Sequence, residues 1–209
     1  MKKLWLFGGS KKEFAQTVTQ EFDVTSFGRH NLDYSDVDSF IENITDIPDI
    51  IVFNIANNGF QINQTKKYTS KEEISNFTNI VNTTFYFQLR VTEWFFQNYE
   101  NKRILWLTSL EPYHLKFHEE NKEGDLIIYR MSRAIEHQAI YMQNVLHHNI
   151  NKKNIIMGIC VGANVKGTDS FINYVLKNDI LKRGVYGFSH ETLTDGITYT
   201  PQLESIKIY

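Results

Sequence analysis

Short apolar runs alternate along this chain with segments of helical spacing, and this alternation limits the folds that the chain can adopt. The clearest run is Asp49–Asn54, which carries the continuous apolar pattern of strands that a parallel sheet buries on both faces. Further strands are expected at Leu4–Phe7, Val24–Phe27, Arg103–Ser109 and Ile155–Val161. Strands that alternate with helices in this way predict an α/β fold, a doubly wound parallel sheet of the Rossmann type, in a single domain over residues 1–209.

Helices are expected in the segments between these strands. Asp33–Asp36 leads into a helix through Val37 and Ile44. Ser70–Glu73 fits a capping box and opens a long helix that contains Asn82 and extends to Phe96. A shorter helix is expected over Phe171–Leu181, and a last strand at Ile206–Ile208.

The first strand ends at a glycine turn. A helix is expected to follow, and its inward face consists of Phe14, Val18 and Phe22. A strand, a glycine turn and a helix at the start of a chain favour a nucleotide-binding unit. The turn residues are Gly8, Gly9 and Ser10.

A long helix is expected from Tyr129 to about Leu146. One row of residues at intervals of three and four predicts the buried stripe of this helix. That row is Ile135, Ala139, Met142 and Leu146, and a second row beside it is Ala134, Gln138, Tyr141 and Val145. Tyr129 and Arg133 are four residues apart, so they share a face of the helix. A cation beside a phenol favours the phenolate, which makes the tyrosine a candidate general acid or base.

Composition and charge exclude several classes of protein. The net charge is −2 and the pI is about 6.4, which gives no support for nucleic-acid binding. No apolar run approaches the roughly 20 residues that span a bilayer. A single cysteine, Cys160, excludes an intrachain disulfide and a multi-cysteine zinc site, and favours a cytoplasmic location. His114 and His118 are four apart but lack a third ligand, so no metal site is predicted.

The order of elements and polar residues resembles that of the short-chain dehydrogenase/reductase family. Gly8 matches the first glycine of the family's T-G-x-x-x-G-x-G turn, and Asn54-Ile55-Ala56 matches the middle of its N-N-A-G run. Asn82 matches an asparagine inside the fourth helix, and Ser109 the serine that ends the fifth strand. Tyr129 matches the tyrosine of Y-x-x-x-K, with Arg133 in place of the lysine.

The resemblance implies a catalytic set and a nicotinamide cofactor. It implies that Tyr129 transfers the proton of a carbonyl or hydroxyl group while hydride passes to or from the cofactor. Ser109 then orients the same oxygen, Arg133 takes the place of the lysine, and Asn82 supports a proton-relay water. The implied reaction is the reduction of a small carbonyl compound, or the reverse oxidation of an alcohol.

Several motif positions depart from the family. Phe7 stands for the threonine of the turn and Phe53 for the first asparagine of N-N-A-G. Lys12 and Phe14 stand where the second and third glycines allow the pyrophosphate and the helix to approach. Lys11 and Lys12 either replace the lost backbone contacts with charge or are solvated surface lysines. The rival interpretation is therefore a catalytically silent protein of the same fold with a degraded cofactor site.

The segment after the second strand bears on the choice of cofactor. NAD sites usually carry an acid there, whereas Phe27-Gly28-Arg29 offers an arginine, which suits the 2′-phosphate of NADP. NADP is the expected cofactor, with NAD as the alternative. Asp33 resembles an adenine-contacting aspartate, or it belongs to a helix cap. The expected cofactor-binding residues are Gly8, Gly9, Ser10, Lys11, Lys12, Arg29, Asp33, Asn54 and Ala56.

The resemblance also implies a homodimer or homotetramer, because helices four and five of the family pack against a neighbouring copy. The fourth helix carries more aromatic residues than one inward face needs, and exposed apolar surface usually marks an interface. These residues are Phe85, Phe87, Trp94, Phe95 and Phe96.

Overall fold

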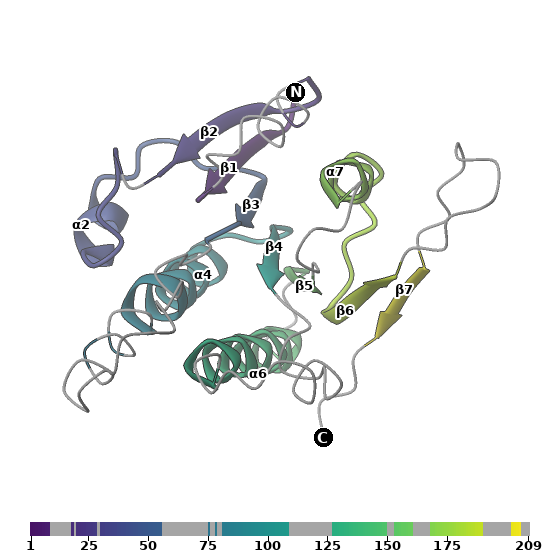
Figure 1. Ribbon diagram of the computed structural model, residues 1–209. Helices are drawn as coiled ribbons and strands as arrows, with labels where there is room; N and C mark the ends of the chain where they lie inside the picture. The colour runs from purple at the N-terminus through teal and green to yellow at the C-terminus, as the bar shows by residue number, and fades with distance from the viewer. Residues whose placement is uncertain are drawn as a thin grey trace.

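The computed structural model describes residues 1–8, 18, 20–28, 30–55, 75, 78, 81–108, 127–149, 153–160, 168–189 and 202–205. Seven strands form one sheet in the order β2-β1-β3-β4-β5-β6-β7 (Figure 1). The strands are β1 (Lys3–Phe7), β2 (Asp23–Phe27), β3 (Ile50–Phe53), β4 (Arg103–Thr108), β5 (Ile155–Cys160), β6 (Gly184–Ser189) and β7 (Gln202–Ser205). Neighbours from β2 through β6 pair in parallel, and β7 is antiparallel to β6.

Helices cover both faces of the sheet, so the doubly wound Rossmann-type fold is confirmed. The described helices are α2 (Val37–Glu42), the π-helical turn η2 (Val81–Tyr86), α4 (Phe87–Asn98), α6 (Ile127–Asn149) and α7 (Thr168–Lys177). Figure 1 shows α7 on one side of the sheet and α2, α4 and α6 on the other. Alternate residues of a strand point to opposite faces of the sheet and pack against different helices. In β4, Leu105 packs with α7, whereas Ile104 and Trp106 pack with α4 and α6.

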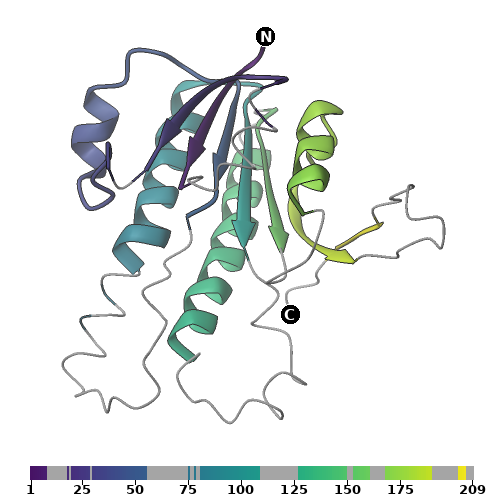
Figure 2. The ribbon, with the colours of Figure 1, turned by 45° about the horizontal axis from the view of Figure 1, so that its top comes forward.

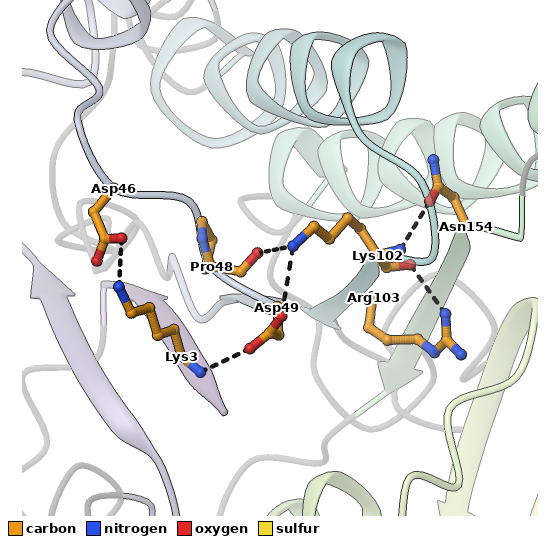
Figure 3. Close-up of polar contacts among 7 residues, drawn as sticks. All are labelled: Lys3, Asp46, Pro48, Asp49, Lys102, Arg103 and Asn154. Atoms are coloured by element: carbon orange, nitrogen blue, oxygen red, sulfur yellow. Dashed lines mark hydrogen bonds and ion pairs between the residues drawn. The ribbon is translucent and has the colours of Figure 1, made fainter. Parts of the chain in front are cut away.

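The amino ends of the strands are tied together by a polar network (Figure 3). The Asp49 carboxylate accepts a hydrogen bond of 3.0 Å from the Lys3 backbone and lies 3.5 Å from Lys102 Nζ. The buried Asn154 side chain accepts from the Lys102 backbone at 2.8 Å and donates to the Tyr99 carbonyl at 2.9 Å. These contacts join β1, β3, β4 and β5 at their starts. The amino ends of these four strands are therefore held together by side-chain contacts.

The end of the chain differs from the sequence-based expectation. No strand was expected between Gly184 and Ser189, but these residues form β6, with Val185 buried against the core. The glycines at positions 184 and 187 obscured the pattern, and Gly184 has a φ of 123° that favours glycine. The last strand that the structure describes is β7 at Gln202–Ser205, and the strand expected at Ile206–Ile208 lies outside the described residues.

The buried face of α6 is not the one that its apolar pattern predicts. Met142 and Leu146 are each 53% exposed, and Tyr141 is 54% exposed. The side chains that are buried instead, at helical spacing, are Arg133, Glu136, His137, Ile140, Gln143, Asn144 and His147. Asn144 bonds both the backbone N–H and the carbonyl of Ile156, at 3.2 and 2.8 Å, so this part of the polar face is bonded to β5.

A glycine in β5 lets α6 approach the sheet. A Cβ atom at Gly158 would lie 2.8 Å from Cδ1 of Ile140, closer than packed carbon atoms allow. Ile140 is fully buried there, in the middle of the polar face of α6. Contact between Ile140 and Gly158 therefore helps to select the face that α6 turns toward β5.

The aromatic residues of the fourth helix also lie differently from the expectation. Phe87, Phe95 and Phe96 have no exposed surface, and Phe85 and Trp94 are half-buried. The expected surplus of exposed aromatic surface on α4 is therefore wrong, because Phe87, Phe95 and Phe96 fill the core and Trp94 packs against it. In the part of the chain that the structure describes, the large apolar side chains exposed on a long helix lie mainly on α6.

Candidate functional site

In the sheet, β2 lies on one side of β1 and β3 lies on the other. The order in which the chain adds strands therefore reverses at β1, which makes the gap between β1 and β3 a topological switch point. Ligands of doubly wound proteins bind at such a switch point, outside the carboxyl ends of the strands. Gly8 and Asn54 follow β1 and β3 at this point. The Gly8 backbone donates to the Phe27 carbonyl, and the Asn54 backbone to the Phe7 carbonyl, each at 2.8 Å.

Gly8 meets a strict conformational requirement. Its φ is 77°, and an added Cβ would lie 2.4 Å from the Asn54 carbonyl oxygen. Only glycine fits where the backbone after β1 passes so close to the backbone after β3. The first motif glycine is therefore retained for a physical reason, the close approach of these two backbone segments.

Two of the residues that differ from the family motifs lie in the hydrophobic core. Phe7 and Phe53 are fully buried, and their rings stack with centroids 5.1 Å apart. Phe27 stacks on the other side of Phe7 at 4.7 Å. Aromatic pairs at these distances stabilise the fold beyond their buried area. The motif threonine and asparagine are thus replaced by mutually packed rings beneath the glycine turn.

The loop after β2 is held by its own polar side chains. Asn31 accepts from the Gly28 backbone at 2.7 Å, and the Tyr34 hydroxyl donates to the Phe27 carbonyl at 3.1 Å. One oxygen of Asp33 accepts from the backbone and the hydroxyl of Ser35, which lowers the pKa of Asp33. Asp33 therefore shapes this turn, and the cap of α2 is Asp36, which accepts from the Ser39 backbone at 3.1 Å. Arg29 lies outside the described residues.

A buried polar cluster joins the carboxyl end of β4 to α6. Glu136 receives hydrogen bonds from Arg133 Nη1 at 2.9 and 2.7 Å and from the Thr108 hydroxyl at 3.0 Å. His137 Nε2 lies 3.0 Å from the same hydroxyl and 3.6 Å from Cys160 Sγ. All five side chains are buried, and Arg133 is 5% exposed. We refer to these five residues as the Glu136 cluster.

The Thr108 hydroxyl is shared between two partners in the Glu136 cluster. It donates its one proton to a Glu136 oxygen at 3.0 Å, so its own oxygen is left to accept. The roles of Thr108 and His137 Nε2 in their 3.0 Å contact depend on the tautomer of the histidine.

The electrostatics of the cluster follow from its burial. Desolvation, with a smaller contribution from Arg133, lowers the pKa of His137 from 6.5 to about 4. Burial, helped by Glu136, raises the pKa of the Cys160 thiol to about 12, so this cysteine is not a nucleophile. Burial also raises the pKa of Glu136, and the contacts with Arg133 and Thr108 oppose that shift.

The low pKa of His137 predicts that the protein loses stability in mild acid. Above pH 6.5 the histidine is neutral in both the folded and unfolded chains, and its full contribution is present. Below pH 6.5 only the unfolded chain takes up the proton, until the pH reaches about 4. The free energy of unfolding should fall by about 3 kcal/mol across this interval because of His137 alone.

Urea unfolding at several pH values between 7.5 and 4 measures this loss. His137→Gln keeps a donor for Thr108 but does not titrate, so its stability should vary less with pH over the same interval. Equal acid sensitivity in the two proteins would show that His137 makes no contribution.

The other site residues predicted from the sequence fall in different places. Tyr129 lies in the first turn of α6, where the structure describes the helix but not this side chain. Figure 2 shows that this end of α6 and the carboxyl ends of β4 and β5 lie at the same edge of the sheet. Asn82 is exposed in the π-helical turn η2, a type of turn that is frequent at functional sites. The remaining predicted residues lie outside the described residues: Gly9, Ser10, Lys11, Lys12, Ala56 and Ser109.

Thr108, Glu136 and His137 are not among the site residues predicted from the sequence. A usable signal was present, because polar residues in α6 recur at the same intervals of three and four as apolar ones. Residues 133, 136, 137, 143, 144 and 147 form this row, and the apolar Ile140 lies in its middle. A polar row with helical period on a long helix is normally its solvent face, so the apolar row was preferred as the buried one.

Solved structures of short-chain dehydrogenases/reductases share the fold of this chain. A Mycobacterium smegmatis short-chain dehydrogenase is 10% identical, with a TM-score of 0.63 over 91% of this chain and 93% of that one. A Serratia marcescens short-chain dehydrogenase/reductase is 12% identical, with a TM-score of 0.61 over 89% and 94%.

A short-chain dehydrogenase from Leptospira borgpetersenii with bound NAD+ is 14% identical, with a TM-score of 0.52 over 88% of this chain and 81% of that one. No family model and no curated protein matches the sequence. The chain therefore has the fold of short-chain dehydrogenases/reductases and resembles divergent members of that family.

The residues that the structure describes contain no group of three or more histidine, cysteine or acidic side chains that could hold a metal ion. Their helices also include none that is long and apolar enough to cross a membrane.

Proposed function

We propose that this protein is an NAD(P)-dependent oxidoreductase of the short-chain type that reduces a small carbonyl compound. The observation that supports the proposal is that the elements that carry or precede the candidate residues share one edge of the sheet. The switch point with Gly8 and Asn54, the end of β4 that precedes Ser109, and the first turn of α6 with Tyr129 share this edge. The low net charge and the single cysteine favour a small-molecule substrate and a cytoplasmic location.

In the proposed reaction the nicotinamide group, when bound, supplies hydride to the carbonyl carbon. Tyr129 donates a proton to the carbonyl oxygen, and the Ser109 hydroxyl donates a hydrogen bond to the same oxygen and orients it. Asn82, exposed in η2, supports the water that returns a proton to Tyr129. The proposed cofactor residues are those of the glycine turn, Arg29, Asp33, Asn54 and Ala56.

Calorimetric titration of the protein with NADPH and NADH is the direct test. Binding of either dinucleotide with a single site per chain supports the proposal. A panel of small ketones and aldehydes, followed by loss of the reduced cofactor, then tests turnover. Absence of binding of both reduced and oxidised cofactors would remove the basis for an enzymatic function.

A second candidate function, a catalytically silent binding protein of the same fold, is favoured by one observation. Arg133, which stands for the family's lysine, is buried and bonded to Glu136 rather than presented at the surface. A lysine that holds a ribose needs its charge at the cofactor. Restoring the glycine turn with Lys12→Gly and Phe14→Gly distinguishes the two functions. A drifted enzyme should bind dinucleotide more tightly after this repair, and a dedicated binding protein should only lose stability.

We expect NADPH to bind more tightly than NADH. Arg29 is the candidate partner of the 2′-phosphate. The acidic residue Asp33, which follows β2, accepts hydrogen bonds from the backbone and the hydroxyl of Ser35. A charge-assisted contact to phosphate is worth about 1.5–3 kcal/mol, so the preference should exceed about tenfold. Arg29→Ala should abolish it in a calorimetric comparison. Lys2→Ala, at the opposite edge of the sheet, is the control and should leave it unchanged.

We further propose that the protein is a homodimer or homotetramer assembled through the outer stripe of α6. This stripe consists of the exposed side chains of Tyr141, Met142, Val145 and Leu146. Contiguous apolar surface on one helix face is typical of an interface. It takes the place of the aromatic surface that was expected on α4.

Light scattering at micromolar concentration should therefore give two or four times the chain mass of 24.6 kDa. The double substitution Met142→Lys and Leu146→Lys should shift the protein to monomer, because two buried ammonium groups oppose association. Tyr174→Lys on α7, where the tyrosine is 49% exposed, is the matched control and should not change the mass. A parent protein of 24.6 kDa would contradict the proposal.

A further inference from the structure

The Glu136 cluster lies on the two elements, β4 and α6, that precede or carry the proposed serine and tyrosine. Thr108 is the last residue of β4 and precedes Ser109, while Arg133 follows Tyr129 by four residues in α6. Residues four apart on a helix lie on the same face, with Cβ atoms about 5–6 Å apart. The carboxylate of Glu136 thus connects the two segments that carry the proposed serine and tyrosine.

The contacts of Glu136 also define the charge at this place. Its two oxygens both accept from Arg133 Nη1, at 2.9 and 2.7 Å, so the guanidinium is held close to an opposite charge. A buried pair of this kind presents a much weaker field to its neighbours than an isolated cation does. Arg133 therefore does not act on nearby groups as a bare lysine does.

We propose that Glu136 is a positioning residue: tethered to β4 through Thr108, it fixes the Arg133 guanidinium and moderates its charge at the turn of α6 that carries Tyr129. This inference rests on the proposed function, in which Tyr129 transfers the proton. It assigns Glu136 a role through Arg133 and Thr108, without contact with substrate or cofactor.

Other titratable groups lie on the elements around the cluster. His137 belongs to the cluster and is neutral above its pKa of about 4, and Cys160 on β5 stays protonated because its pKa is about 12. On β6, Tyr186 donates to the Arg183 carbonyl. On η2 and α4, Tyr86 is 47% exposed, and Arg90 pairs with Glu93. Within the described residues, Arg133 and Glu136 thus form the ion pair of the cluster, with Nη1 and Oε2 2.7 Å apart.

Glu136→Gln tests the inference because it keeps the shape and the acceptor for Thr108 but removes the negative charge. The Arg133 charge is then no longer moderated, which favours the phenolate of Tyr129. The pKa of Tyr129 should fall by about one pH unit, a tenfold change in its ionisation equilibrium. In the pH profile of kcat/KM, the limb that reports this group should move by the same amount.

A second measurement does not depend on catalysis. The ultraviolet absorbance of phenolate is titrated in the parent and in Tyr129→Phe, and the difference isolates Tyr129. The same pair of proteins is compared in the Glu136→Gln background. Glu93→Gln is the matched control, since Glu93 forms an i, i+3 pair with Arg90 on the neighbouring helix α4. It should leave the Tyr129 titration unchanged.

The double variant Arg133→Met and Glu136→Gln keeps the test decisive if Glu136→Gln alone fails to fold. It removes both charges, and the pKa of Tyr129 should then rise above that of the parent, because Arg133 is nearer to Tyr129 in the helix than Glu136. An unchanged Tyr129 titration in every folded variant would overturn the inference. A shifted titration in a protein that binds no dinucleotide would support the inference and reject the proposed function instead.

Discussion

Replacing Tyr129 with phenylalanine is expected to lower kcat by about 10²–10⁴-fold, because a positioned acid–base group contributes that much to proton transfer. Dinucleotide affinity should stay within a few-fold of the parent, since the hydroxyl acts on the substrate oxygen. Steady-state kinetics and calorimetric titration of the same preparation separate these two effects. Ser109→Ala should cost a comparable factor in kcat, because it removes a hydrogen bond to the reacting oxygen.

The matched control for this substitution lies on the same helix. Tyr141 is 54% exposed on the outer stripe of α6, two turns or more from Tyr129, so Tyr141→Phe should leave kcat unchanged. Full activity of Tyr129→Phe would reject the assignment of the general acid. Loss of activity in both variants would point instead to a general effect on α6.

Arg133→Met is expected to lower the free energy of unfolding by about 3–5 kcal/mol, because it leaves the buried Glu136 carboxylate without its counter-charge. Both residues of the pair are almost fully buried, with side-chain exposures of 6% and 2%. Adding Glu136→Gln should recover most of the loss, since the second change removes the uncompensated charge while keeping an acceptor for Thr108. Chemical denaturation at pH 7 measures both effects.

The neighbouring helix provides a control for the role of burial. Arg90 and Glu93 on α4 form the same i, i+3 pair at 3.2 Å, but their side chains are 39% and 32% exposed. Arg90→Met should therefore cost only about 0–1 kcal/mol. If Arg133→Met and Arg90→Met had equal effects, burial of the Glu136 cluster would have no energetic consequence.

At the glycine turn, the family motif predicted a required glycine but did not predict how the neighbouring residues pack. Gly8 was expected from the motif, and the structure gives the reason, a φ of 77° beside the Asn54 carbonyl. From the sequence, Phe7 and Phe53 could be recognised only as residues that differ from the family motifs. Their stacking in the core depends on the pairing of β1 with β3, which brings together residues far apart in the chain.

The positions of most strands and of α2, α6 and α7 could be read from the sequence, because they rest on local patterns. A run that is apolar on both faces, such as Ile50–Phe53, predicts a central parallel strand wherever it occurs. β6 escaped detection because its glycines interrupt such a pattern, and it becomes a strand through pairing with β5.

The orientation of α6 was decided by the tertiary structure alone. By sequence, the row with Met142 and Leu146 is the better candidate for burial, because apolar side chains gain most from leaving water. The structure buries the row with Arg133, Glu136 and Asn144 instead. Their partners Thr108 and Ile156 lie in other segments, and burying a polar group is favourable only when such partners are in place. Local pattern thus determined that α6 is a helix, and only the assembled sheet determined which of its faces is inside.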